Sequence, residues 1–104
     1  MAQIFETDEE IERVILVGVQ LDDDDDAESS LEELKELADT AGAVTVGKVI
    51  QPRDSFHPAT YIGKGKLEEL RVLIDQLDAT GIICDDELTP AQLKNLEDEL
   101  ATKV

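Results

Sequence analysis

Four consecutive residues, Gly63, Lys64, Gly65 and Lys66, have types and spacing suited to holding a phosphate group. Glycine lets the backbone turn its N–H groups toward an anion, a following helix adds partial positive charge at its N-terminus, and each lysine adds a full charge. The chain contains neither the G-x-x-x-x-G-K-[ST] loop nor a complete G-x-G-x-x-G. A phosphate contact and an ordinary turn into a helix therefore both remain open for these residues.

Positive charge is concentrated in one part of this acidic chain of 104 residues. Segment 47–66 holds four cationic residues against the single carboxylate of Asp54, for a net +3, and the remaining residues carry −20, which gives the formal total of −17. This balance excludes a protein that grips nucleic acid with its whole surface and disfavours attraction to anionic lipid, because both need clustered Lys and Arg.

Three rings lie among these cations, those of Phe56, His57 and Tyr61. Cations interleaved with rings that stack are what unpaired RNA bases and their phosphates require. In the alternative interpretation Phe56 and Tyr61 fold back onto the core and the lysines only solvate the turn, and the sequence favours neither. The candidate RNA or phosphate contacts are Lys48, Arg53, His57, Tyr61, Gly63, Lys64, Gly65 and Lys66.

Carboxylates offer further hypotheses. The aspartate run at 22–26 lacks the Gly and Glu positions of an EF-hand loop, so a solvated loop is preferred and no metal site is predicted. The start of this run, with Asp85 and Asp86 after another predicted strand, resembles the acidic pocket of phospho-receiver domains, which stays an alternative function. Cys84, the only cysteine, lies in an apolar run where a thiol is inert, and no catalytic residue is predicted.

The elements that must position these residues alternate between strands and helices. Apolar runs predict buried strands at 13–21, 43–50 and 80–84. Leucines and alanines at helical spacing predict helices at 31–41, 67–77 and 89–100. Residues 51–66 are rich in Pro, Gly and basic side chains, and a loop of this length inside a domain is often functional.

Capping residues mark the predicted helix starts. Ser30 with Glu33 has capping-box spacing at the start of the first helix, and Ser29 with Glu32 offers the same one residue earlier. Gly65 lies near the N-cap of the second helix. The third helix opens with Thr89 as N-cap, Pro90 at the first helical position and Gln92 completing a capping box.

These elements predict an α/β fold: a small parallel, Rossmann-like sheet of three to four strands flanked by helices, in the order β-α-β-loop-α-β-α. The crossover is expected to be right-handed and the strand order 2-1-3-4, with a fourth strand beginning at Lys103. Residues 1–12 are predicted to be an acidic N-terminal segment and residues 13–104 the domain.

Intrinsically disordered and membrane-spanning proteins are two further classes that the sequence excludes. About 30% of the residues are Leu, Ile, Val or Phe, whereas acidic disordered chains fall below ~20%. No apolar run approaches the ~20 residues of a transmembrane helix. We therefore expect a folded cytoplasmic protein with no membrane or DNA partner.

Three motifs resemble the N-terminal domain of HflX-type ribosome-associated GTPases. They are Gln51-Pro-Arg-Asp54, His57-Pro-Ala-Thr-Tyr-Ile-Gly-Lys-Gly-Lys66 and Asp85-Asp-Glu-Leu-Thr-Pro-Ala-Gln-Leu-Lys-Asn-Leu-Glu97. The resemblance runs from about Arg13 to Val104 and implies an α/β domain that precedes a linker, a helical subdomain and a G domain. The aspartate run at 22–26 departs from the family's usual composition.

The resemblance also implies a function. The family binds the large ribosomal subunit, splits or rescues stalled ribosomes under stress and hydrolyses GTP, and its N-terminal domain reaches ribosomal RNA through the loop that corresponds to residues 51–66. GTP and Mg²⁺ are expected in the G domain, the domain's partner in cis, and not in this chain, which has no P-loop and is not expected to be an enzyme by itself. The family is also reported to interact with ATP through this domain, so an ATP-binding module is an alternative.

Overall fold

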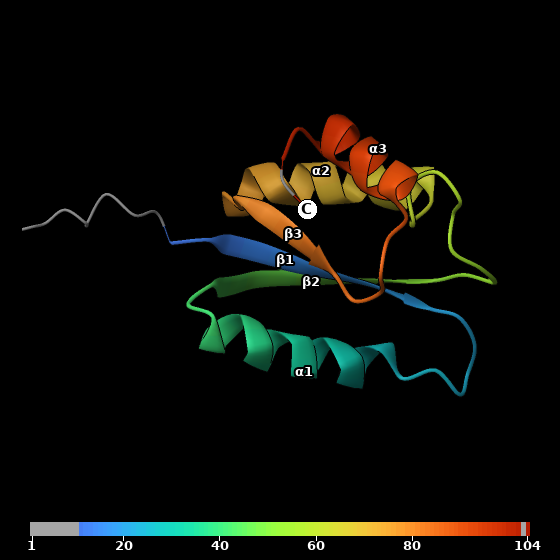
Figure 1. The fold of residues 1–104 in the computed structure, drawn as a ribbon, viewed down its shortest axis with the longest axis horizontal. Coiled ribbons are helices and arrows are strands. Elements are labelled where there is room, and N and C mark those ends of the chain that lie inside the picture. Colours follow the sequence, from blue (N-terminus) through green and yellow to red (C-terminus); the bar gives the residue numbers. More distant parts are fainter. Residues whose placement is uncertain (1–10, 103) are drawn as a thin grey trace, which may run out of the picture.

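The apolar run that begins at Arg13 forms the central strand of the computed structural model, which describes residues 11–102 and 104 (Figure 1). Along the chain the elements are β1 (Arg13–Gln20), α1 (Ala27–Thr40), β2 (Val44–Pro52), α2 (Lys64–Leu77), β3 (Gly81–Cys84) and α3 (Pro90–Leu100). The predicted α/β class and element order are confirmed. Most of the acidic segment predicted at 1–12 lies outside the described residues.

The sheet has β1 in the middle. β2 and β3 lie on either side of β1, and both pair with it in parallel, as predicted for the first three strands. The predicted start of a fourth strand, Lys103, lies outside the described residues, and Val104 belongs to no strand. Because the strands are parallel, the segments that follow them, 21–26, 53–63 and 85–89, all leave the same end of the sheet (Figure 1).

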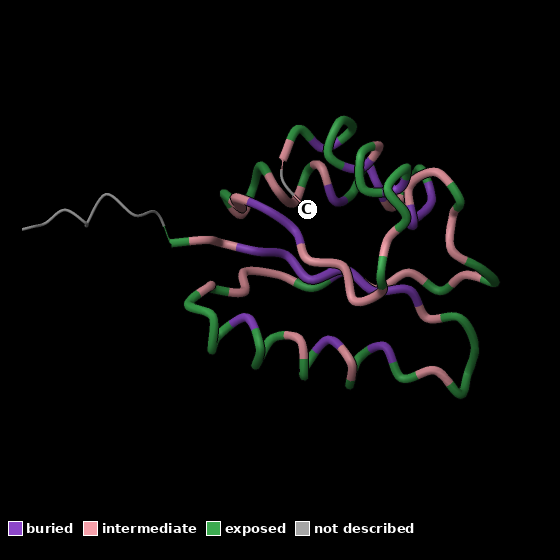
Figure 2. Tube along the Cα trace, in the orientation of Figure 1, coloured by how far each residue is buried: buried purple, intermediate pink, exposed green. Residues whose placement is uncertain are grey.

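Both faces of β1 are covered, which explains its near-continuous apolar sequence. Ile15 and Val17 belong to the core that the sheet forms with α2 and α3, whereas Val14 and Leu16 pack with Leu31 of α1 on the opposite face. Alternate side chains of a strand point to opposite faces, so one strand supplies both cores. β1 is the longest buried stretch along the chain trace (Figure 2).

Two helices begin earlier than the spacing predicts. α1 starts at Ala27, and its N-cap is Asp26, whose carboxylate accepts a 3.1 Å hydrogen bond from the backbone N–H of Ser29. The capping boxes predicted at Ser30 and Ser29 are therefore wrong, because an earlier aspartate caps the first turn and both serines lie inside the helix. α2 starts at Lys64 with Gly63 as N-cap, so Gly65 lies inside its first turn.

The predicted start of α3 is confirmed. Thr89 Oγ1 accepts a hydrogen bond from the backbone N–H of Gln92 (3.1 Å), and Gln92 Oε1 accepts one from the backbone N–H of Thr89 (2.9 Å). Among the described helices, none has the length and apolar character to cross a membrane.

Candidate nucleic-acid interface

The β2–α2 loop, residues 53–63, folds into a defined turn. The backbone N–H of His57 donates to the carbonyl of Tyr61 (3.0 Å), and the N–H of Tyr61 donates back to His57 (2.9 Å). Inside this turn, His57 Nδ1 accepts hydrogen bonds from the backbone N–H groups of Ala59 (3.1 Å) and Thr60 (3.3 Å). These bonds use the Nδ1 lone pair of the half-buried ring, and its Nε2 atom has no hydrogen-bond partner among the residues that the structure describes.

Tyr61 lies inside the core and does not project from the loop. Its side chain is 1% exposed, its ring packs on Phe56 with centroids 5.3 Å apart, and its hydroxyl donates a 2.6 Å hydrogen bond to Asp86 Oδ2. Burial, and then this hydrogen bond, raise the pKa of the phenol well above its usual range. The prediction that Tyr61 stacks on RNA bases is therefore wrong, because the ring is needed to fill the core.

The backbone of Tyr61 is strained as well. Its φ of +70° lies in the left-handed region, which costs a residue with a side chain about 1–2 kcal/mol. Such a conformation persists only where surrounding contacts impose it, and it occurs preferentially at functional sites.

The first turn of α2 carries positive charge where a helix prefers negative charge. Its N-cap, Gly63, provides no side-chain hydrogen bond, and the turn has no acidic residue. Lys64 is exposed, and no residue in the described part of the chain forms an ion pair with it, whereas Lys66 pairs with Glu69 at 3.2 Å. Cations are unfavourable at this end of the helix dipole, so a bound anion would stabilise the arrangement.

Arg53 adds a third cation at the same place. Its Nη1 atom lies 2.8 Å from the position that a Cβ on Gly63 would occupy, so the missing side chain of Gly63 admits the guanidinium beside the helix start. The N–H of Gly63 donates to Gln51 Oε1 (2.8 Å) and is not free for an anion. Gly65 has nothing within 4 Å of a hypothetical Cβ, so its backbone is open to approach.

Lys48 lies apart from these cations. It belongs to β2, and its ammonium pairs with Glu28 (2.9 Å) and Glu32 (2.5 Å) of α1, on the other face of the sheet. The hydrogen bonds raise the pKa of Lys48 and lower that of Glu32. The prediction that groups Lys48 with the cations of the basic loop is therefore corrected, because its ammonium already forms ion pairs with two carboxylates.

His57 and Lys64 share one surface. Together with Ala59, Thr60, Leu67, Glu68 and Glu99 they line a groove of about 350 Å³ beside the first turn of α2. A ring edge and an exposed ammonium at one groove suit the base and the phosphate of a nucleotide. The two carboxylates that line the same groove, Glu68 and Glu99, both pair with Arg71, which offsets part of their charge.

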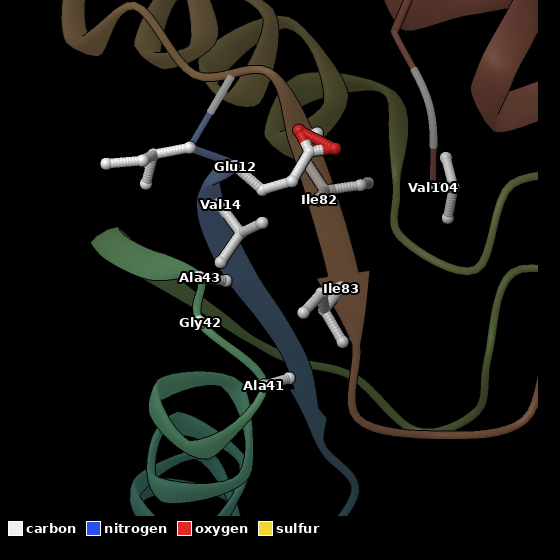
Figure 3. Close-up of a pocket in the computed structure, with 10 residues that line it drawn as sticks. Glu12, Val14, Ala41, Gly42, Ala43, Ile82, Ile83 and Val104 are labelled. Carbon is white, nitrogen blue, oxygen red and sulfur yellow. The ribbon is translucent and has the colours of Figure 1, made fainter. Parts of the chain in front are cut away.

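A larger cavity of about 610 Å³ lies at the opposite end of the sheet (Figure 3). The apolar side chains of Val14, Ile82 and Ile83 line it, and the carboxylate of Glu12, also at its wall, accepts a 2.8 Å hydrogen bond from Thr80 Oγ1. This is the amino end of the strands, whereas open α/β sheets bind ligands at the carboxyl end. We therefore place the candidate interface at the β2–α2 loop.

Some of the aspartates singled out in the sequence have structural partners. Asp22 Oδ1 accepts hydrogen bonds from the N–H groups of Asp24 (3.0 Å) and Asp25 (2.9 Å), and Asp86 accepts from Tyr61. Burial raises the pKa of Asp85. Within residues 11–102, no three His, Cys, Asp or Glu side chains are close enough together to hold a metal ion.

Two residues that support the candidate interface are not evident from the sequence. The sequence indicates only a helix cap for Gln92 and only a family motif for Asn95. Both donate hydrogen bonds to the β2–α2 loop, at His57 O (2.9 Å) and Ala59 O (3.0 Å). Their i, i+3 spacing, which places two amides on one helix face, is the signal that could have found them.

Comparison with known proteins agrees with the fold and the motifs. Residues 28–104 match the family described as GTP-binding GTPase N-terminal. The chain is 61% identical over its whole length to a GTPase HflX of Lacrimispora saccharolytica, of which it covers 25%. It is 48% identical over 89% of its length to a GTPase HflX of Caldanaerobacter subterraneus, covering 21% of that protein, and 31% identical over 83% of its length to a GTPase HflX of Escherichia coli, covering 20%.

The chain thus spans a quarter or less of the length of these relatives, and the aligned part includes the loop and the α3 motif described above. The family match covers most of the chain. The chain belongs to the GTP-binding GTPase N-terminal family, as an N-terminal domain of the HflX type.

Proposed function

We propose that this domain binds RNA of the large ribosomal subunit through the first turn of α2 and the β2–α2 loop. The observation that carries the proposal is the gathering of Arg53 and Lys64 at a helix N-terminus that has no side-chain cap and no first-turn carboxylate. A phosphate would satisfy the first-turn N–H groups and offset the cations, and Lys66 would add to its field. The half-exposed ring of His57 would meet a neighbouring base.

The acidic remainder of the chain gives this contact a direction. With −20 outside segment 47–66, the other surfaces repel phosphates, so the basic loop is the favourable approach. We therefore expect the domain to bind bulk nucleic acid weakly and to prefer a site that accepts one projecting loop.

For the full-length protein we propose a ribosome-associated GTPase that splits or rescues stalled ribosomes under stress. Its G domain would hold GTP and Mg²⁺ and would be the partner of this domain in cis. The proposal is supported by the relatives, each named GTPase HflX and at least four times longer than the part that matches. By itself this chain is not proposed to hydrolyse GTP, since its sequence has no P-loop.

The test is binding of the full-length protein to purified large subunits, by co-sedimentation over a range of salt concentrations. The variant Lys64→Glu/Lys66→Glu is expected to bind more weakly and to lower the slope of log K against log salt by roughly one unit for each phosphate that it no longer neutralises. The matched control is Lys35→Glu/Lys94→Glu, which changes the net charge equally on the surfaces of α1 and α3. Equal binding by the two double variants would refute the proposal.

A nucleotide-binding module is the second candidate, favoured by the groove of about 350 Å³ next to the same helix N-terminus. Grooves of this size are at the lower end of those that hold small ligands. Titration calorimetry of the protein with ATP and with GTP, with Lys64→Glu as the comparison, would test it. Heat that disappears in the variant supports this function, and no heat from either nucleotide rules it out.

A further inference from the structure

Two amide side chains of α3 hold the backbone of the β2–α2 loop in place. Gln92 Nε2 donates to the carbonyl oxygen of His57 (2.9 Å), and Asn95 Nδ2 donates to that of Ala59 (3.0 Å). The donors and acceptors are 35 and 36 residues apart in sequence, so these are tertiary contacts between α3 and the loop. Gln92 is 6% exposed, and it is the one buried polar residue in the part of the chain that the structure describes.

The residue type of Gln92 indicates that the loop contact matters. Its Oε1 atom accepts the backbone N–H of Thr89 in the capping box, a role that glutamate fills equally well. Only glutamine has the second group, the Nε2 donor that reaches His57. In a chain with 26 acidic residues, a glutamine at this position is explained by the donor and not by the cap.

The turn that these amides hold contains a residue in a strained backbone conformation. Tyr61 is in the left-handed region at φ +70°, and the bonds between His57 and Tyr61 close the turn around it. Asp86 holds the Tyr61 hydroxyl from the end of β3. Contacts from two other elements, α3 and the end of β3, therefore impose a backbone conformation that the loop sequence does not favour.

This turn sets the start of α2. Ile62, which is fully buried, and Gly63, the N-cap, are the two residues that separate Tyr61 from Lys64. Any change in the turn therefore moves the first helical N–H groups and the lysine that follows them. The same change shifts the place where Arg53 lies against Gly63.

We propose that Gln92 and Asn95 are positioning residues, which act through the His57–Tyr61 turn to hold the cationic first turn of α2 in its binding geometry. The inference rests on the proposed function, since it specifies how that interface is kept ready. A loop that is already ordered before RNA arrives loses little conformational entropy on binding, and this raises affinity without any contact of its own.

The test compares variants of the full-length protein in large-subunit binding at several salt concentrations. Gln92→Glu keeps the cap acceptor and loses the donor, Asn95→Asp has the same shape without a donor, and Asn95→Ala removes the donor without adding charge. The control is Ala91→Glu, which adds one negative charge at an exposed site on the same helix. We expect fivefold or greater weakening and a smaller salt slope in the three donor variants, with Ala91→Glu close to the native protein.

Two further measurements separate positioning from folding. Amide hydrogen exchange should quicken at Thr60 and Tyr61 in the donor variants while β1 remains protected. Asn95→Ala is the mildest of the three changes. If either acidic variant unfolds, binding by Asn95→Ala still tests the positioning role. Binding of the donor variants equal to that of Ala91→Glu, in a series where Lys64→Glu/Lys66→Glu binds weakly, would overturn the positioning role and leave the proposed function standing. Normal binding by that lysine variant would instead overturn the proposed function.

Discussion

The hydroxyl of Tyr61 donates a 2.6 Å hydrogen bond to Oδ2 of Asp86, and so joins the β2–α2 loop to the end of β3. Tyr61 is 1% exposed and has a φ of +70°, so a bulky residue in an unfavourable conformation anchors the loop from inside. The ring that the sequence suggests for stacking on RNA is thus part of the support beneath the candidate interface.

Removing this hydroxyl should destabilise the domain. Tyr61→Phe is expected to lower the free energy of unfolding by about 1–3 kcal/mol, because a partly buried carboxylate loses its donor while the ring still fills the core. Urea denaturation followed by circular dichroism measures the change. Asp86→Asn, which keeps an acceptor for the phenol, should cost less than Tyr61→Phe, and the reverse order would contradict the assigned donor and acceptor.

Alkaline pH should unfold the domain progressively. Burial raises the pKa of the Cys84 thiol from 9.0 to about 12, and burial also raises that of Tyr61 above its usual 10.0. Between pH 9 and 12 the unfolded chain releases these protons while the folded chain keeps them, so the unfolded state is favoured as pH rises. Each group lowers stability by at most about 1.4 kcal/mol per pH unit within its window.

Denaturation midpoints at pH 7, 9 and 10 would reveal this dependence. Cys84→Ser removes the thiol and should flatten the decline between pH 9 and 10. A native protein equally stable at pH 7 and pH 10 would show that Cys84 is not buried as described, since the phenol of Tyr61 responds mainly above its usual pKa of 10.0.

Gly65 offers a substitution in which stability and binding should move in opposite directions. Gly65→Ala meets no atom within 4 Å and replaces a glycine inside a helix, so we expect a gain of roughly 0.5–1 kcal/mol in unfolding free energy. If a phosphate approaches this backbone, the added methyl group should weaken large-subunit binding several-fold. A variant that is more stable and binds normally would remove Gly65 from the interface.

Gly63 is the matched comparison for that experiment. Gly63→Ala would place a methyl group 2.8 Å from Arg53 Nη1, so the guanidinium must move away from the helix start. We expect weaker binding without the gain in stability that Gly65→Ala brings.

Lys48 should contribute little to RNA binding despite its place in the basic segment of the sequence. Its two glutamate partners offset its charge and would repel a phosphate, so Lys48→Gln is expected to retain native affinity and salt slope. The free energy of unfolding should change little, since ion pairs exposed to solvent contribute little to stability. A drop in the salt slope similar to that of Lys64→Gln would restore Lys48 to the interface.

Much of the fold follows from local sequence. The apolar run from Arg13 predicts a strand buried on both faces, and Thr89, Pro90 and Gln92 predict the start of α3, because an apolar run and a helix cap are each made of residues adjacent in sequence. The distribution of charge along the chain likewise locates the segment that contains Arg53, Lys64 and Lys66.

Contacts between distant residues decided the rest. Tyr61 is buried because its ring packs in the core between the sheet, α2 and α3, where Asp86, 25 residues later, accepts its hydrogen bond. Lys48 is paired because α1 packs beneath β2. Gln92 and Asn95 reach the loop across 35 and 36 residues. Periodicity and capping describe each element alone, so the sequence determined which elements form and where the positive charge lies. Only tertiary packing decided which side chains face the solvent and which hold the loop in place.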